Sequence, residues 1–484
     1  MPHDCRGLAL VEFSTLRHTV VIVGGGFSGA VLAINLLRRP PAPATDLILI
    51  ERSQGIGRGV AYAQRDFPYL LNVAAGRLSI DPNDPEDFLR FARRYDPAAE
   101  AGDFLPRAWY GDYLEDSLHR AEREAPAQIR LQRMHTEVRG IVPDPTSCLR
   151  VLPAEHAPIL ADRVVLALGN PPPPLLPWAE ELQDHDAYLH DPWQVPQGLE
   201  PQHAVLVIGN GLTMADVVLA LTHDRDQGPV VHTLSRRGLV PLSQSQERVD
   251  PSDEKMGSEG AQLLAASHSL RELLRTVRRL VRESQARGGD WRPVIQLVRH
   301  WAQQLWRALP HPEQRRFVRH LLPIWSVHRH RQPPQSAQRL EQLREQGRLH
   351  VKAGRIQKMS ERDGRIKVWW EPRGAADCES LHVDWVINAL GPDYVLDRTT
   401  DPLAQSLLKS GMIVADPLQL GLRTGPHGAC IDREGRISER LFYLGPMLRA
   451  GHWEITGAAE LLQWADDLAE HLRAQAQAQI QSQS

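Results

Sequence analysis

Two short apolar runs, each followed by glycines and then by a helical pattern, organise this chain of 484 residues. The first run is Val20–Val23, and the helical pattern after it extends to Arg38. The second run is Ala204–Ile208, and its helical pattern extends to about His223. A run of β-formers, a glycine turn and an apolar helical face together predict a strand-turn-helix unit. Because the unit occurs twice, we expect an α/β fold with two Rossmann-like dinucleotide-binding domains.

Two further apolar runs, residues 164–169 and 386–391, both end in Ala-Leu-Gly. After the first of them, residues 171–201 contain eight prolines, which indicates an extended connection between domains. We therefore predict that one domain is interrupted by the other. Its first part is 19–170, the inserted NAD(P)H-binding domain is 171–385, and its second part is 386–473.

The inserted domain contains a long segment with helical periodicity. Apolar residues recur at helical spacing from Leu270 to Val281 and again from Val294 to Leu305. This predicts a helical insert at about 262–331. By contrast, glutamine alternates with alanine or serine in residues 474–484, and we expect a disordered tail there.

The composition excludes several classes of protein. Hydrophobic content is 42%, charged content is 24% and the formal net charge is −3, which is ordinary for a soluble globular chain. The four cysteines lie far apart and form no Cys-x-x-Cys pair, which argues against a zinc ribbon, a disulfide scaffold or a dithiol reductase. The uncharged stretch 19–37 contains three consecutive glycines and an asparagine, so we interpret it as strand, turn and helix rather than a membrane span. We expect a cytoplasmic protein with no membrane partner.

The first glycine turn satisfies the G-x-G-x-x-G pattern of a dinucleotide site. Gly24 permits the tight turn, Gly26 lets the backbone approach a pyrophosphate, and Gly29 allows close packing of helix on strand. An acid, Glu51, ends the next apolar run, where a carboxylate can bind a ribose. We predict cofactor contacts from these residues and from their neighbours in the turn and after the acid: Phe27, Ser28 and Arg52.

The second glycine turn departs from the pattern in two ways. Gly209 and Gly211 are present, but Met214 replaces the third glycine. At the end of the next strand there is no acid, and Arg236 and Arg237 stand there instead. Two guanidinium groups suit the 2′-phosphate of NADPH, although solvated arginines are the alternative. We place Leu212 and Thr213, at the start of the following helix, in the same nucleotide site.

Two dinucleotide sites in one chain indicate a flavin, FAD, reduced by NADPH or NADH. With no Cys-x-x-Cys pair to relay electrons, the acceptors left open are dioxygen, a quinone and a protein.

Several further segments carry a resemblance to known proteins. The chain resembles the two-dinucleotide-domain flavoproteins, which include flavin-containing monooxygenases and ornithine or lysine N-hydroxylases. It is similar in particular to a bacterial family of FAD/NAD(P)-binding proteins, and an FAD-dependent urate hydroxylase and an amino-acid N-oxygenase also look similar. The segments that carry this resemblance are Gly57–Tyr62, Leu71–Val73, Pro106–Tyr113, Trp325–Arg331, Leu444–Pro446 and Trp453–Thr456.

The resemblance implies an FAD-dependent monooxygenase that uses NAD(P)H and dioxygen to hydroxylate a small polar or anionic substrate, with urate as one candidate. N-hydroxylation of an amine or amino acid is the nearest alternative, and a non-oxygenating NAD(P)H-dependent flavin oxidoreductase is another. One departure stands out: many members carry Gly-Asp near the C-terminus to hold the flavin, whereas here Pro446 follows Gly445.

The remaining candidates lie in these segments. We predict cofactor contacts from Arg58, Asn72, Gly391, Gly445 and Trp453, the last at the start of a helix whose N-terminus could face the flavin. Packing alone is the alternative for that helix.

Three residues are candidates for a catalytic or substrate-binding role. Arg107 stands among aromatic residues and could bind an anion, or stack on those rings instead. His328 and His330 belong to a dense cationic run, 328–331, which could bind an anionic group of the substrate or of NADPH. Metal binding by the two histidines is the alternative, but no third ligand is evident nearby.

The insert is strongly basic. From 269 to 331 there are fourteen arginines, no lysine and four acids, a formal charge of +10. Most of these arginines fall on the outer faces of amphipathic helices, so we expect solvated faces and ion pairs between domains rather than a nucleic-acid partner. The expected partners are a small-molecule substrate and dioxygen, and the sequence leaves a homo-oligomer open.

Overall fold

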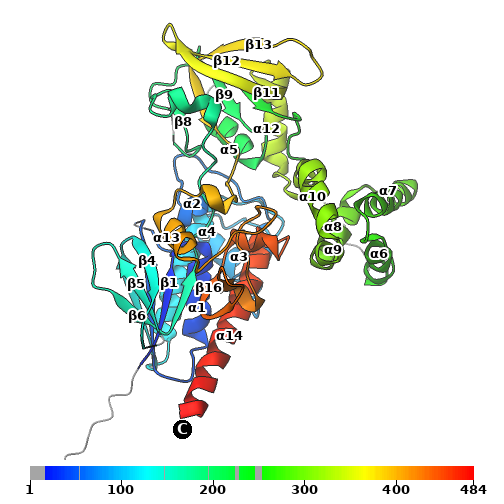
Figure 1. Ribbon diagram of the computed structural model, residues 1–484. Helices are drawn as coiled ribbons and strands as arrows, with labels where there is room; N and C mark the ends of the chain where they lie inside the picture. The colour runs from blue at the N-terminus through cyan, green and yellow to red at the C-terminus, as the bar shows by residue number, and fades with distance from the viewer. Residues whose placement is uncertain are drawn as a thin grey trace, which may run out of the picture.

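The computed structural model describes residues 17–53, 55–146, 148–194, 196–223, 228–245 and 253–483. Within them the chain forms two mainly parallel sheets, a small antiparallel sheet and a group of helices beside the two large sheets (Figure 1). The predicted fold class, with one dinucleotide-binding domain inserted in another, is confirmed.

The first large sheet has five parallel strands and one antiparallel edge strand. In spatial order its strands are β15 (Ala429–Ile431), β16 (Ile437–Tyr443), β7 (Arg163–Leu166), β1 (His18–Val23), β2 (Thr45–Glu51) and β3 (Ile129–His135). The small antiparallel sheet, inserted between β3 and β7, consists of β4 (Val138–Pro143), β5 (Leu149–Pro153) and β6 (Ile159–Ala161).

The second large sheet is parallel through its centre and ends in an antiparallel meander. In spatial order its strands are β13 (Glu379–Val383), β12 (Arg365–Pro372), β11 (Leu349–Arg362), β10 (Val230–Ser235), β9 (Ala204–Ile208), β14 (Trp385–Asn388) and β8 (Tyr188–Leu189).

The helices divide between the first domain, the second domain and the insert. Those of the first domain are α1 (Phe27–Arg38), α2 (Gly59–Tyr62), α3 (Asp87–Ala92), α4 (Arg107–Glu124), α13 (Pro402–Ser410) and α14 (Ala458–Gln483). Those of the second are α5 (Leu212–Leu221) and α12 (Pro334–Glu345). Those of the insert, between β10 and α12, are α6 (Asp253–Ala266), α7 (Leu270–Ala286), α8 (Arg292–His300), α9 (Ala302–Ala308), α10 (His311–Arg316) and α11 (Leu322–Arg329).

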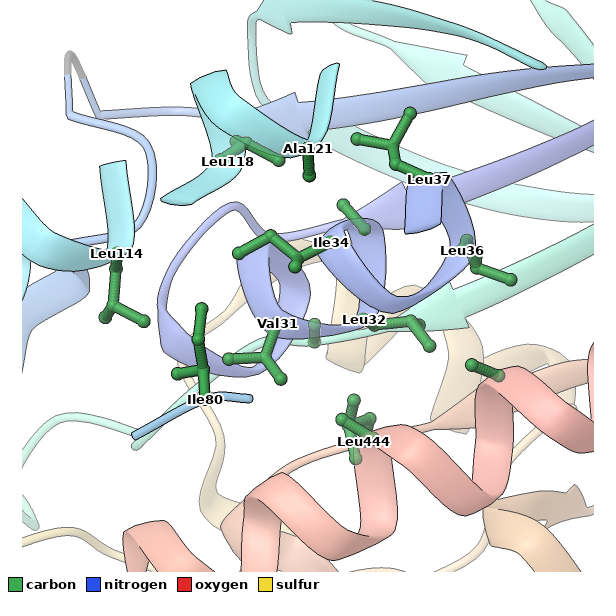
Figure 2. Close-up of a cluster of buried hydrophobic side chains, with 14 of the residues drawn as sticks. Val31, Leu32, Ile34, Leu36, Leu37, Ile80, Leu114, Leu118, Ala121 and Leu444 are labelled. Atoms are coloured by element: carbon green, nitrogen blue, oxygen red, sulfur yellow. The ribbon is translucent and has the colours of Figure 1, made fainter. Parts of the chain in front are cut away.

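Helix α1 is buried along nearly its whole length, because it packs on the sheet and is covered by α4 and α14. Figure 2 shows Val31, Leu32 and Ile34 among side chains from α4 and from Leu444. Burying large aliphatic side chains stabilises the folded state by about 1.5–3 kcal/mol each. This packing fixes the position of the helix N-terminus, which begins directly after the glycine turn.

The two Ala-Leu-Gly runs occupy equivalent places in the two domains. Gly24 has φ +105°, and a Cβ there would lie 2.2 Å from the carbonyl oxygen of Ala167. Gly209 has φ +108°, and a Cβ there would lie 2.5 Å from the carbonyl oxygen of Ala389. In each sheet, the strand before the Ala-Leu-Gly run is paired with the strand before the glycine turn. The absent side chains therefore let the two strand ends meet.

This equivalence corrects the predicted boundary at residue 386. Residues Trp385–Asn388 form β14, which pairs with β9 and β8 in the second sheet. The second domain therefore extends through Asn388, and the chain returns to the first domain only after it. The sequence suggested an earlier return because the second run repeats the first, and a repeat cannot show which sheet a strand joins.

Two other predicted boundaries also change. The insert is helical as expected, but its first helix begins at Asp253 rather than near 262. The tail expected to be disordered from 474 continues α14 to Gln483. Alanine and glutamine are good helix formers, and a helix already anchored by its buried N-terminal half is readily prolonged by them.

Within the described ranges, every helix is too short or too polar to cross a lipid bilayer.

Candidate functional site

A cavity of about 470 Å³ opens above the first glycine turn. Its walls come from the turn, from the end of β2, from α2 and from the segment that precedes α14. The predicted residues among its lining are Gly24, Gly26, Phe27, Ser28, Glu51, Arg52 and Arg58. Gly29 faces the opposite way, since a Cβ there would lie 1.9 Å from the carbonyl oxygen of Gly24. Its role is to let helix and turn pack together.

The carboxylate of Glu51 is held on the rim of this cavity by the backbone. One oxygen accepts a hydrogen bond from the Gly25 N–H at 2.7 Å, and the other accepts one from the Ser53 N–H at 2.7 Å. Each carboxylate oxygen has a second lone pair, so Glu51 retains acceptor capacity toward a ribose in the cavity.

The two arginines that line this cavity are both engaged by acids. Arg52 lies 3.5 Å from Asp401 and is largely exposed. Arg58 is paired with Asp112 and Glu115, each at 2.6 Å, and its Nη1 atom is buried without a partner. These ion pairs hold the two guanidinium groups beside the cavity and fix both arginine side chains to the protein.

A second cavity, of about 290 Å³, adjoins the first and shares Tyr62, Thr456 and Ala458 with it. Thr456 and Ala458 lie at the N-terminus of α14, whose free N–H groups and dipole make this point favourable for negative charge. Asn72 lines the second cavity, and its backbone carbonyl accepts a hydrogen bond from Gln244 Nε2. The other wall of the cavity comes from the helical insert.

The two candidate histidines are separated by the structure. His330 lines the second cavity. Burial and the nearby guanidinium groups of Arg329, Arg449 and Arg299 lower the pKa of His330 to about 3, so its imidazole is neutral near pH 7. His328 instead points back along its helix, with Nδ1 2.8 Å from the Ile324 carbonyl oxygen, and lines neither of these two cavities. Of the two candidate histidines, His330 therefore lines the second cavity and His328 does not.

Arg107 joins the two domains. Its guanidinium lies 2.8 Å from Asp216 on α5 of the second domain, and its Nε donates to the Leu70 carbonyl. Burial raises the pKa of Asp216, and the positive charge of Arg107 opposes that shift. The sequence offers Arg107 as an anion site or as a partner of the neighbouring aromatic rings, whereas the structure pairs its guanidinium with a carboxylate of the protein. The sequence could not show this, because Asp216 lies more than a hundred residues away.

The second glycine turn leaves the N-terminus of α5 accessible. Apart from its chain neighbours, no atom of the described residues lies within 4 Å of a Cβ built on Gly211, whereas Met214 is fully buried. Leu212 and Thr213 form the first turn of α5. Asn210 is buried, and neither its Oδ1 nor its Nδ2 has a partner within the described chain. Backbone N–H groups of a free helix end are thus presented to a phosphate.

Arg236 and Arg237 directly follow β10, where the sequence placed them. Arg236 is exposed and Arg237 is half-buried. Neither takes part in an ion pair with any residue that the structure describes. Both guanidinium groups are therefore available to an anion at the end of this strand.

The last three predicted cofactor residues lie outside the two cavities. Trp453 is buried against Trp306 of the insert, with ring centroids 4.4 Å apart, so the expected flavin contact is wrong. The helix predicted to begin near it begins at Ala458. Gly445 packs near the Tyr443 hydroxyl, and Gly391 lies in the connection after β14. It is Pro446, next to Gly445, that lines the first cavity.

Residues 21–171 match the model of the FAD-NAD(P)-binding family. The match covers the first glycine turn and the strands of the first sheet up to β7, and it accords with the shape of the larger cavity. No curated protein matches the chain in sequence.

Solved structures share the fold over nearly the whole chain. Ornithine hydroxylase from Pseudomonas aeruginosa is 14% identical with a TM-score of 0.64, covering 95% of this chain and 99% of its own. L-lysine 6-monooxygenase from Pseudomonas syringae is 17% identical with a TM-score of 0.63, covering 94% and 99%. Ornithine N-hydroxylase from Kutzneria sp. 744, in a complex with reduced FAD, NADP⁺ and L-ornithine, is 17% identical with a TM-score of 0.58, covering 95% and 99%. At these identities the likeness is one of fold.

The residues present fit an FAD. A Cβ on Gly26 would project into the larger cavity and come no closer than 3.4 Å to another protein atom, Gly59 Cα. The space beside Gly26 is thus open to a ligand, as the approach of a pyrophosphate requires.

The substitution Gly26→Val should give a folded protein that does not retain FAD. The valine side chain meets no close protein contact but fills the space that a pyrophosphate needs. Flavin absorbance of the purified protein measures retention, and circular dichroism verifies folding. Gly211→Val, at the equivalent position of the second turn, is the matched control and should stay yellow. A yellow Gly26→Val protein of unchanged affinity would show that the cavity is not the FAD site.

Removing Arg107 should destabilise the protein. Arg107→Ala leaves the Asp216 carboxylate without its counter-charge at the contact between the domains, at a cost of about 3 kcal/mol. Thermal unfolding measures the effect, and Arg130→Ala, at an exposed arginine of β3, serves as the control. The double variant Arg107→Met with Asp216→Asn should recover part of the loss. If single and double variants are equally unstable, the charge pair is not the cause.

Proposed function

We propose that this protein is an FAD-dependent monooxygenase that uses NAD(P)H and dioxygen to hydroxylate a small polar substrate. The observation that carries the proposal is the junction of two cavities at Tyr62, Thr456 and Ala458. One cavity has the glycine turn and the acid of an FAD site, and the other is large enough for a small molecule. A substrate in the second cavity would thus lie next to the ring end of a flavin in the first.

The reaction consumes NAD(P)H, a proton, dioxygen and the substrate, and it yields NAD(P)⁺, water and the hydroxylated product. When bound, FAD supplies the hydride acceptor and the centre at which dioxygen is activated. The protein binds the pyrophosphate at the N-terminus of α1, accepts a hydrogen bond at Glu51, and presents the N-terminus of α14 to the junction of the cavities. The insert lines one side of the second cavity and would limit the access of water to a bound substrate.

Among substrates, N-hydroxylation of an amine or amino acid is better supported than urate hydroxylation. The solved structures that share this fold include enzymes named for ornithine and lysine. Urate hydroxylation is supported only by the sequence resemblance. The non-oxygenating flavin oxidoreductase remains the alternative from another class, and it differs in forming no oxygenated product.

Oxygen transfer is the test of this function. FAD-loaded protein is incubated with NADPH, isotopically labelled dioxygen and, separately, ornithine, lysine, cadaverine and urate. We expect at least one compound to accelerate NADPH oxidation and to yield a product containing labelled oxygen, detected by mass spectrometry. Steady oxidation of NADPH with every electron recovered in peroxide or in an added protein acceptor, and with no labelled product, would show a flavin oxidoreductase instead.

The arginines after β10 should select the reductant. Arg236→Ala with Arg237→Ala should weaken NADPH binding by about 1.5–3 kcal/mol through the loss of charge-assisted hydrogen bonds to the 2′-phosphate. NADH, which lacks that phosphate, should be affected little. Steady-state KM values for both nucleotides measure the difference. Equal weakening of the two would mean that these arginines do not contact the phosphate.

A further inference from the structure

The second cavity contains an unpaired buried cation, Arg331. This residue follows α11 by two positions, is 8% exposed and lines the cavity. It belongs to the cationic run 328–331 that the sequence analysis singled out. Its position puts a guanidinium group in the wall that the insert contributes, across from the loop that contains Asn72.

The neighbouring arginines of the same wall are neutralised by carboxylates. Arg292 is paired with Asp290. Arg299 and Arg329 share Glu454 and Glu460, with Arg299 3.7 Å from Glu454 and Arg329 3.6 Å from Glu460. These ion pairs neutralise Arg292, Arg299 and Arg329. Each of the carboxylates involved is therefore already paired with one of these three arginines.

Arg331 differs from them because its side chain makes no hydrogen bond or ion pair with any residue that the structure describes. Its Nε is buried without an acceptor among the described residues. The guanidinium lies over the face of Trp291, whose ring centroid is 5.8 Å from the guanidinium carbon, near the outer limit of a cation–π contact.

The burial of Arg331 lowers the stability of the folded protein, yet its guanidinium group stays charged. Burial, together with the like charges of Arg292, Arg329 and Arg299, lowers the pKa of Arg331 to about 10 against the opposing charge of Asp290, so the group stays protonated near pH 7. A buried cation that no carboxylate contacts directly is unfavourable. A ligand anion in the cavity would remove that penalty on binding.

The opposite side of the cavity has a different character. Leu71, Val73 and Phe104 form an apolar wall, and Tyr62 lies at the junction with the larger cavity. Asn72 and Arg77 line the same side, so the loop contributes polar groups as well. A molecule with an anionic group toward the insert and an apolar stretch along Leu71, Val73 and Phe104 would fit this cavity and would present its other end to the flavin.

We propose that Arg331 binds a carboxylate of the substrate, so that the substrate is a small organic acid oxidised at the end remote from its carboxylate. The planar guanidinium fork matches a carboxylate in geometry, and its buried positive charge matches an anionic group. A diamine with no carboxylate would instead meet repulsion from this wall. The assignment rests on the proposed function for its oxidation step, whereas the anion site itself rests on Arg331 alone.

The experiment compares a carboxylate with its uncharged isostere. Isothermal titration calorimetry on FAD-loaded protein measures the binding of benzoate and benzamide to the natural protein, to Arg331→Met and to Arg278→Met. Arg278 is exposed on α7 and makes no ion pair within the described residues, so it controls for the loss of one insert charge. We expect the natural protein and Arg278→Met to bind benzoate at least about ten-fold more tightly than benzamide, and Arg331→Met to lose that preference.

Two further measurements keep the result decisive. Arg331→Met should melt at or above the temperature of the natural protein, because it removes an unpaired buried charge. Arg331→Lys retains the charge but not the fork, and its preference for benzoate should be intermediate. The proposal is overturned if the natural protein shows no preference, or if Arg331→Met retains it, or if Arg331→Met changes only the affinity for FAD.

The outcomes also separate this site from the proposed function. A benzoate preference that depends on Arg331, together with no labelled product from any substrate, would leave the anion site in place and reject the monooxygenase. Labelled product from an uncharged substrate or a diamine, with no benzoate preference, would reject the anion site and leave the monooxygenase in place.

Discussion

The close approach of two strand ends at each glycine turn is the constraint on which the structure depends. Gly24 admits the carbonyl of Ala167, and Gly209 admits that of Ala389. With a side chain at either position, the strand before the Ala-Leu-Gly run could not lie beside the strand before the turn. The helix N-termini, and with them both predicted nucleotide sites, are positioned by these contacts.

A second constraint is the contact between the insert and the first domain, although in the sequence the insert lies within the second domain. The insert lies between β10 and α12 of the second domain, yet its arginines are paired with Glu454 and Glu460 of the first. Trp306 stacks on Trp453 across the same contact, and its indole N–H donates to the Ala450 carbonyl. Part of the positive charge of the insert thus forms ion pairs with the first domain beside the second cavity.

The connection between the two nucleotide-binding domains has the same physical character. Arg107 and Asp216 are both largely buried, and each compensates the desolvation of the other. Three segments distant in sequence therefore meet around the cavities through pairs of opposite charge. Apolar packing holds each domain together and also joins the insert to the first domain through Trp306 and Trp453, and ion pairs are added to it at the contacts between the parts.

The sequence by itself determined the two strand-turn-helix units, their order, and the residues of the first unit that line the larger cavity. Gly26, Ser28 and Glu51 could be placed because their roles follow from local spacing along a strand, a turn and a helix. The tertiary structure alone decided the rest. Trp453 packs against the insert, and Arg107 forms an ion pair with Asp216. His330 and Arg331 line the second cavity, whereas His328 does not. Those outcomes depend on contacts between segments more than a hundred residues apart, and the spacing of residues along the chain does not encode which buried charges are paired within the protein.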